Sequence, residues 1–364
     1  MRYIITGGGT GGHIFSAIAT AKAIKKIDTD AVFVFVGAND YMEKEIVPRA
    51  GYDFIGMDIH RMNRFQKWKN YILPYEILKG MWQSYRLIKK FNPHAVVGTG
   101  GFATGPVLFT AQLMKIPTFI QEHNAYPGIT NRLLAKNATR IHTAFKSIEN
   151  YFDKNKILLT GNPVRDEFYQ IPPSKESVAV KFGFKPELPV VLMIGGSRGA
   201  APMNKAVEKI LPELRKANIQ LIFQTGKKLF EQYKHYDNEF VRVLPFIDNM
   251  LEAYAASDLV VSRAGAMSFT EIALLGKPAI LVPDPNFEQD HQTKNAAEIV
   301  KENAAVLVKE TELQDKLWPA IQKIINDKTL QNQLRQNIKK MAFPNAAGDI
   351  AEDIVEHLRK TKKI

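Results

Sequence analysis

Short apolar runs recur along the chain, and most of them are followed by a glycine-rich or polar turn and then by a segment with helical spacing. Such nearly continuous apolar runs are typical of strands in a parallel sheet that is covered on both faces. Strands that alternate with helices predict an α/β fold. The runs that we assign as strands are residues 3–6, 31–37, 95–98, 118–124, 157–160, 189–194, 220–224, 241–245, 257–263 and 279–283.

The same pattern starts again in the second half of the chain. A polar, proline-bearing stretch ending at Pro189 separates the two halves, and each half begins with a strand and a glycine loop. We therefore expect two Rossmann-like domains. The first comprises residues 1–162, joined by a C-terminal helix at about 343–364, and the second comprises residues 163–342.

Three predicted strands lead into glycine-rich loops, at residues 7–12, 98–105 and 195–199. A strand, a glycine loop and the start of a helix direct several backbone N–H groups to one point, which suits a phosphate or diphosphate. The alternative for each loop is a tight turn that needs small residues for packing. Two such loops on one sheet favour a shared anionic ligand.

The first loop ends at His13, and this histidine separates two functional interpretations. The spacing Gly7-x-Gly9-x-x-Gly12, with Asp40 as a ribose ligand, also fits a nicotinamide oxidoreductase, although it leaves the other two loops unexplained. A nicotinamide loop needs no imidazole, whereas a transferase that deprotonates a hydroxyl beside a diphosphate does. The alternative role for His13 is capping or packing.

Further polar residues stand where strands end or helices begin. Glu122 and Asn124 lie at the end of a predicted strand, which makes them ligand candidates or strand-end caps. Ser268 and Glu271 scan as a capping box, but a carboxylate in this position can also bind ribose hydroxyls. The predicted helix that begins at residues 290–296 starts with hydrogen-bonding side chains, which suit the hydroxyl groups of a sugar.

Composition narrows the class of protein. The chain of 364 residues is 45% hydrophobic and 24% charged, as expected for a soluble globular protein, and it has no cysteine, which excludes disulfides, thiolate catalysis and cysteine-ligated metals. Asp28 and Asp30 mimic a metal-binding Asp-x-Asp, but they precede a strand, where a solvated turn is expected. No targeting segment and no membrane-spanning run is evident, so we expect a protein that stays in the cytoplasm.

The positive charge is concentrated in the first half. Residues 1–162 carry 21 Lys and Arg against 11 Asp and Glu, of a total formal charge of +12. No nucleic-acid motif accompanies them, and an anionic membrane surface is the better partner. We expect the basic and aromatic residues 61–73 either to meet the membrane or to form a solvated loop. The following helical stripe is expected to be core; it comprises Ile77, Leu78, Met81, Trp82, Tyr85 and Ile88.

Together these motifs resemble the MurG family of GT-B glycosyltransferases over nearly the whole chain. The resemblance rests on residues 6–13, 98–106, 122–124, 161–165, 195–200 and 263–271 with His291 and Gln292. It implies a GT-B fold, with two parallel-sheet domains facing a central cleft. It also implies an inverting, metal-independent transfer of GlcNAc from UDP-GlcNAc to lipid I, undecaprenyl-diphosphate-MurNAc-pentapeptide, at the cytoplasmic side of the cell membrane. No cofactor is implied.

The resemblance also implies roles for individual residues. His13 is the candidate base, and Glu122 is the other candidate for that role. Thr10, Gly11 and Gly12 would lie on the donor-sugar side, Glu271 would bind ribose, and Gln292 would bind the GlcNAc hydroxyls. The remaining donor contacts would be Asn124, Arg165, Ser197, Ile247, Ala266, Met267, Ser268, Phe269 and Thr270.

The chain departs from the family pattern at three positions. Ser16 replaces a usual proline, Phe102 a common tyrosine, and His291 the first residue of a frequent Gln-Gln pair. Other functions remain open at this point: a related UDP-sugar:lipid transferase, a UDP-GlcNAc epimerase, which would not need the basic aromatic segment, and a non-enzymatic membrane adaptor. The acceptor peptide and the oligomeric state are not determined by the sequence.

Overall fold

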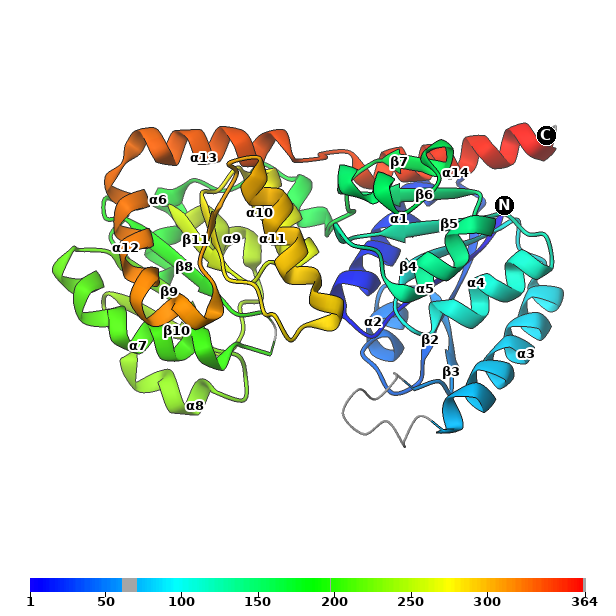
Figure 1. The fold of residues 1–364 in the computed structure, drawn as a ribbon, viewed down its shortest axis with the longest axis horizontal. Helices are drawn as coiled ribbons and strands as arrows, with labels where there is room; N and C mark the ends of the chain where they lie inside the picture. Colours follow the sequence, from blue (N-terminus) through cyan, green and yellow to red (C-terminus); the bar gives the residue numbers. More distant parts are fainter. Residues whose placement is uncertain (61–70, 197, 363–364) are drawn as a thin grey trace. The chain divides into compact units, whose positions relative to one another are not determined.

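The computed structural model describes residues 1–60, 71–196 and 198–362, and it divides into two compact units (Figure 1). Unit 1 comprises Met1–Arg165 and Asn345–Ile364, and unit 2 comprises Asp166–Pro344. Each unit contains one parallel sheet, with seven strands in unit 1 and six in unit 2 among the described residues. The predicted α/β class with two Rossmann-like halves is therefore confirmed.

The sheet of unit 1 has the order β3-β2-β1-β4-β5-β6-β7, so the direction in which strands are added reverses between β1 and β4. Its central strands are fully buried because helices cover both faces. The strands are β1 (Arg2–Gly7), β2 (Val32–Ala38), β3 (Asp53–Met57), β4 (Ala95–Gly100), β5 (Thr118–Glu122), β6 (Arg140–Thr143) and β7 (Ile157–Leu159).

Helices on both sides of this sheet close the core of unit 1. The C-terminal helix packs against α1, and the two bury Ile14, Ile24, Ile350 and Ile354 together. The helices are α1 (Gly11–Ile27), α2 (Glu43–Arg49), α3 (Leu73–Phe91), α4 (Thr104–Leu113), α5 (Ile129–Leu134) and α14 (Ala346–Lys362), with short 3₁₀ turns η2 (Ala135–Asn137), η3 (Lys146–Asn150) and η4 (Lys154–Lys156).

The sheet of unit 2 has the order β10-β9-β8-β11-β12-β13 and reverses direction between β8 and β11. Its strands are β8 (Val190–Ile194), β9 (Gln220–Gln224), β10 (Val241–Leu244), β11 (Leu259–Ser262), β12 (Ala279–Leu281) and β13 (Val306–Leu307). Its helices are α6 (Lys175–Ala179), α7 (Ala201–Lys216), α8 (Phe230–Tyr233), α9 (Met250–Ala256), α10 (Ala266–Leu275), α11 (His291–Lys301), α12 (Leu313–Asn326) and α13 (Lys328–Lys340). Its 3₁₀ turns are η5 (Asp166–Tyr169), η6 (Val180–Phe182), η7 (Lys234–Tyr236), η8 (Glu288–Asp290) and η9 (Glu310–Glu312).

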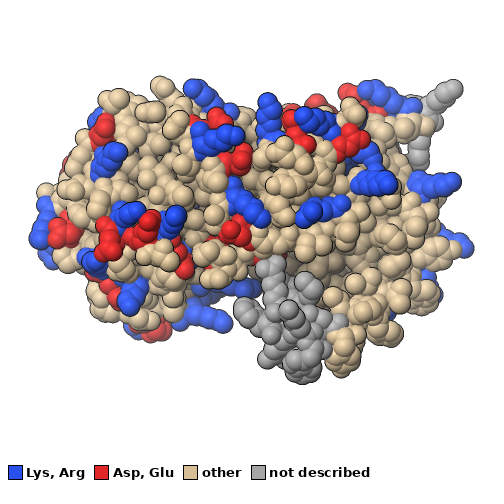
Figure 2. All heavy atoms as spheres, in the orientation of Figure 1, with Lys and Arg blue, Asp and Glu red and all other residues tan. Residues whose placement is uncertain are grey.

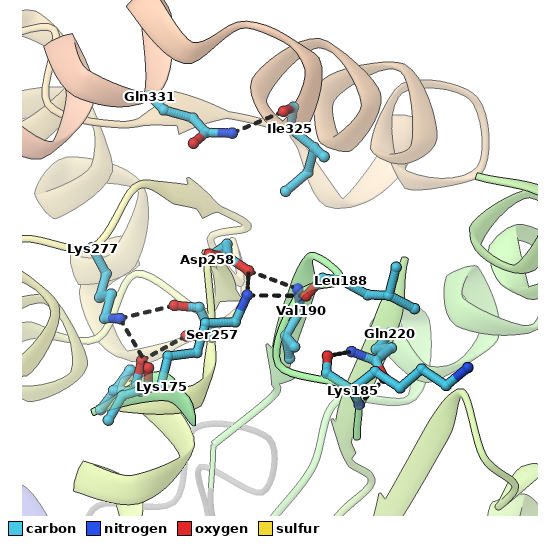
Figure 3. Close-up of polar contacts among 12 residues, drawn as sticks. Lys175, Lys185, Leu188, Val190, Gln220, Ser257, Asp258, Lys277, Ile325 and Gln331 are labelled. Carbon is cyan, nitrogen blue, oxygen red and sulfur yellow. Dashed lines mark hydrogen bonds and ion pairs between the residues drawn. The ribbon is translucent and has the colours of Figure 1, made fainter. Parts of the chain in front are cut away.

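Internal polar pairs occupy the amino-terminal edge of the unit 2 sheet (Figure 3). Asp258 Oδ2 accepts hydrogen bonds from Lys175 Nζ at 2.7 Å and from the Val190 N–H at 2.8 Å. A cavity of about 80 Å³ beside Lys175 and Asp258 is much smaller than the roughly 300–1,000 Å³ of ordinary ligand pockets. This edge therefore serves to hold the sheet together.

Helix α3 corrects one sequence prediction. Most of the stripe expected in the core faces outward, with Leu78 65% and Trp82 58% exposed, and Ile88 is its one deeply buried member. The buried face instead consists of Glu76, Gly80, Ser84 and Ile88, spaced by four residues. Of the predicted membrane segment 61–73, residues 61–70 lie outside the described part of the chain.

Candidate active site

In unit 1, the candidate base lies where the sheet reverses direction. Helix α1 begins at Gly11, with Thr10 as its N-cap and Gly12 and His13 in its first turn. Gly100, at the end of β4, has φ of +107°, and a Cβ there would lie 2.5 Å from His13 Cε1. Glycine at this position therefore leaves room for the imidazole.

A main-chain carbonyl group fixes the His13 ring. His13 Nδ1 lies 2.7 Å from the Thr99 carbonyl oxygen, and the Thr99 hydroxyl donates to the His13 carbonyl at 2.9 Å. A carbonyl oxygen only accepts hydrogen bonds, so Nδ1 carries the proton and Nε2 carries the lone pair of the neutral ring. In this tautomer Nε2 can take a proton from a hydroxyl group.

A buried carboxylate that sequence reasoning missed supports the first glycine loop. Glu43, at the start of α2, accepts hydrogen bonds from the N–H of Gly9 at 3.2 Å and of Ala38 at 3.1 Å. The Gly8 N–H of the same loop donates to the Gly100 carbonyl at 3.2 Å, so these two N–H groups of the predicted anion loop are paired within the protein. No sequence motif marks Glu43, because its partners lie in other turns.

Glu122, the other candidate base, organises the loop that follows β5. Its carboxylate accepts hydrogen bonds from Asn124 N at 3.0 Å, Gly128 N at 3.0 Å and Asn131 Nδ2 at 2.7 Å, while Asn124 Nδ2 lies 3.4 Å away. Burial raises the pKa of Glu122, and these donors act in the opposite direction. These contacts fit the alternative interpretation of Glu122 given above, in which it caps the end of a strand.

The turn after β7 brings the candidate residue Arg165, and Asn162 beside it in the sequence, near this region. Asn162 Nδ2 donates to the His123 carbonyl at 3.2 Å. The guanidinium carbon of the half-buried Arg165 lies 5.6 Å from the centre of the Phe15 ring in α1. Unit 1 therefore brings His13, Glu122, Asn124 and Arg165 to the carboxyl ends of its strands, where ligands bind in such sheets.

In unit 2, a glutamine joins the third glycine loop to a predicted donor contact. Gln224 ends β9; its Nε2 donates to the Gly196 carbonyl at 3.0 Å, and its Oε1 accepts from the Ile247 N–H at 2.9 Å. Ile247 itself is buried, and Ser197 lies outside the described residues. Apart from its place at a strand end, no sequence motif marks Gln224.

Helix α10 follows the strand at which the unit 2 sheet reverses direction. Its N-cap is Gly265, so Ser268 lies inside the first turn, which excludes the capping box that the sequence left open as one of two interpretations. Ala266, Phe269 and Thr270 are buried, and Met267 and Ser268 are half-buried. Glu271 Oε2 accepts a hydrogen bond from the buried Tyr254 hydroxyl at 3.1 Å, which fixes this carboxylate.

Gln292 lies in the first turn of α11 and is also tied to a loop. Its Oε1 accepts a hydrogen bond from the Asp284 N–H at 2.9 Å, after β12. One turn later, Asn295 Nδ2 donates to the Ala264 carbonyl at 3.2 Å. These contacts join α11 to the loops after β11 and β12, at the same edge of the sheet as the start of α10.

Among residues 1–60, 71–196 and 198–362, no group of three or more His, Asp or Glu side chains is arranged to hold a metal ion. None of the helices described is both long enough and apolar enough to span a bilayer.

The chain matches two glycosyltransferase domain models. Residues 3–143 match the glycosyltransferase family 28 N-terminal domain, and residues 190–350 match the family 28 C-terminal domain. The UDP-N-acetylglucosamine–N-acetylmuramyl-(pentapeptide) pyrophosphoryl-undecaprenol N-acetylglucosamine transferase of Flavobacterium psychrophilum is 42% identical and covers 99% of both chains. The protein of the same name from Bacteroides fragilis is 43% identical over 98% of this chain and 95% of its own.

Solved structures of other proteins also match the fold of this chain. MurG of Acinetobacter baumannii superposes with a TM-score of 0.80 at 26% identity, covering 98% of this chain and 99% of that one. A UDP-N-acetylglucosamine 2-epimerase superposes with a TM-score of 0.70 at 15% identity, over 98% of this chain and 95% of its own, which shows a common fold only. The predicted GT-B fold class is confirmed.

Proposed function

Because this chain belongs to the MurG family of glycosyltransferases, we propose that it transfers GlcNAc from UDP-GlcNAc to the muramyl 4-hydroxyl of lipid I, which yields lipid II for peptidoglycan synthesis. The observation that carries the assignment is the 42% identity over 99% of both chains to a transferase of that name. The geometry of His13 supports it independently, since the Thr99 carbonyl holds Nδ1 as a donor, which makes Nε2 the basic atom of the neutral ring.

We assign the proton transfer to His13. Nε2 takes the proton of the 4-hydroxyl as that oxygen forms a bond to the anomeric carbon of GlcNAc. The bond from this carbon to the diphosphate oxygen breaks, its electron pair leaves with UDP, and the anomeric configuration inverts. Arg165 and Ser197 are our candidates to stabilise the departing diphosphate, which would need no metal. Glu122 is assigned to holding the loop with Asn124.

We assign the donor nucleotide to unit 2. The start of α10 carries the positive end of a helix dipole, and its N-cap Gly265 has no side chain to occupy the first N–H groups. Ala266, Met267, Ser268, Phe269 and Thr270 would contact the nucleotide together with Ile247. Glu271 would accept the ribose hydroxyls, and Gln292 would bind the hydroxyls of GlcNAc. Thr10, Gly11 and Gly12 are assigned to the donor-sugar side in unit 1.

We also propose that the outer face of α3 meets an anionic membrane surface. Four exposed residues of α3 are spaced three and four residues apart, namely Tyr75, Leu78, Trp82 and Tyr85, and the exposed Tyr71 lies just before the helix. Lys79, Arg86, Lys89 and Lys90 are interspersed, and α4 packs alongside with exposed Phe109 and Leu113. Much of the surface in the lower right of Figure 2, over α3 and α4, is uncharged.

Such a face combines apolar area with cationic side chains, which is the chemistry that binds anionic lipid. The Arg86 guanidinium lies 4.7 Å from the centre of the Trp82 ring, so charged and aromatic groups lie together. We therefore propose a peripheral protein at the cytoplasmic side of the cell membrane. An epimerase of soluble nucleotide sugars would have no use for this face.

The test is acceptor-dependent release of UDP from UDP-GlcNAc with a short-chain lipid I analogue. We expect release that persists in EDTA and falls by about 10²- to 10⁴-fold in His13→Ala. The matched control is His235→Ala, which alters an exposed histidine in η7. No release with any muramyl lipid would refute the transferase assignment, and conversion of UDP-GlcNAc without an acceptor would favour the epimerase.

A further inference from the structure

Behind His13, a chain of hydrogen bonds runs into the core of unit 1. His123 Nδ1 lies 3.1 Å from His13 Nδ1, and the two rings stack with centroids 5.1 Å apart. On the other side of the ring, His123 Nε2 lies 3.1 Å from Ser16 Oγ, which lies 2.6 Å from Gln121 Oε1. His123, Ser16 and Gln121 are all buried.

The Thr99 carbonyl determines the direction of every bond in this chain. Because His13 Nδ1 donates to that carbonyl, it can also share its proton with His123 Nδ1 only if the latter is an acceptor. A neutral His123 then carries its proton on Nε2 and donates it to Ser16 Oγ. The Ser16 hydroxyl in turn donates to Gln121 Oε1. Any other direction would place two protons between the histidine rings.

The surroundings of His123 favour its neutral form. Burial lowers the pKa of His123 well below its ordinary value, and the charge of a protonated His13 lowers it further. When His13 becomes an imidazolium, His123 therefore remains a neutral acceptor for its Nδ1 proton. An accepting nitrogen at this position stabilises the cation that proton abstraction creates.

We propose that His123, held in its Nε2–H tautomer by Ser16 and Gln121, is a positioning residue that fixes the ring of His13 with Nε2 as the base. This inference rests on the proposed function, in which His13 abstracts the acceptor proton. It also gives Ser16 a role that a proline could not fill, since proline has no hydroxyl to accept from His123.

The first test removes only the Ser16 hydroxyl. Nitrogen NMR of histidine-labelled protein should show the Nδ1–H tautomer at His13 and the Nε2–H tautomer at His123. In Ser16→Ala we expect mixed tautomers at His123 and a fall in kcat of about tenfold, with KM for UDP-GlcNAc changed less than about twofold. The control is Ser84→Ala, which removes an equally buried hydroxyl from α3. An Nδ1–H tautomer at His123, or an equal kcat in the two variants, would overturn the proposal.

The second test asks whether the accepting atom itself is needed. In His123→Asn the amide oxygen can replace Nδ1 as acceptor, so we expect a kcat within about fivefold of the unmodified protein, whereas His123→Leu should lose about 10- to 100-fold. Equal losses in the two variants would contradict the role of Nδ1. If His123→Leu does not fold, the proposal is tested by the NMR tautomers and by the kcat of Ser16→Ala alone. Full activity in His13→Ala would instead refute the proposed base.

Discussion

Two buried carboxylates shape the candidate site before any ligand arrives. Glu43 holds Gly9 of the first glycine loop, and Glu122 holds Asn124 and Gly128 of the loop after β5. Charge-assisted hydrogen bonds to backbone N–H groups are stronger than neutral ones, so these loops are fixed by the protein itself. The substrate then meets a preorganised surface, which reduces the reorganisation needed in the transition state.

At the residue scale, Lys277 gives unit 2 a specific pH dependence. Burial lowers the pKa of Lys277 to about 8 from 10.5, and its Nζ donates to the Ser257 carbonyl at 2.8 Å (Figure 3). Between pH 8 and 10.5 the unfolded chain binds this proton and the folded chain does not, so stability rises with pH. Lys277→Met should remove that rise.

The measurement is urea unfolding of both proteins between pH 7.5 and 10.5. We expect the unfolding free energy of the unmodified protein to rise by about 1–2 kcal/mol more than that of Lys277→Met over this pH range. This figure allows for the partial exposure of Lys277. Lys205→Met, at an exposed position in α7, serves as the control and should leave the slope unchanged. Parallel pH profiles for Lys277→Met and the unmodified protein would refute this assignment.

The sequence could identify those site residues whose position follows from the neighbouring strand or helix in the chain. His13 lies in the first turn of α1, Glu122 ends β5, and Glu271 lies in the second turn of α10, and the doubly wound topology brings such positions to one edge of a sheet. Whether each is a cap or a ligand could not be decided, because a side-chain direction depends on distant partners. Glu43 and Gln224 were missed for the same reason: their partners lie elsewhere in the chain.

At the scale of elements, α3 shows the limit of periodicity. The spacing of apolar residues predicts the helix, but this spacing alone does not distinguish a stripe that packs in a core from one that is exposed. The helix instead approaches its neighbours through small residues, since a Cβ at Gly80 would lie 3.0 Å from Ile59 Cδ1 and 3.4 Å from Pro106 Cβ. A stripe that faces lipid has the same period as one that faces a core.

The proposed membrane face can be tested by adding charge to it. In Leu78→Glu/Trp82→Glu, two exposed apolar side chains become anionic, so we expect binding to vesicles with anionic lipid to fall at least about tenfold. Turnover of a soluble acceptor analogue should stay within about twofold. The measurement is vesicle sedimentation, with Ile171→Glu in unit 2 as a control at an exposed apolar residue. Unchanged sedimentation of the double variant would exclude this face.

At the scale of the molecule, the chain leaves unit 1 at Arg165 and returns to it at Asn345. The returning helix α14 buries Ile350, Ile354 and Leu358 against α1, so unit 1 cannot complete its core until the last residues are present. Unit 2 is continuous in sequence and has its own core. The two units should therefore respond differently to loss of the C-terminus.

Deletion of residues 345–364 should abolish cooperative unfolding of unit 1 while unit 2 still unfolds in one transition. The milder Ile354→Ala should cost about 2–5 kcal/mol, since it leaves a cavity beside α1. Calorimetry with and without UDP separates the units, because a ligand raises the Tm only of the unit that binds it. Lys360→Ala, at an exposed site on α14, is the control. A truncated chain that keeps a stable unit 1 would show that α14 is dispensable, and a UDP-dependent shift in unit 1 alone would contradict the assignment of the donor nucleotide to unit 2.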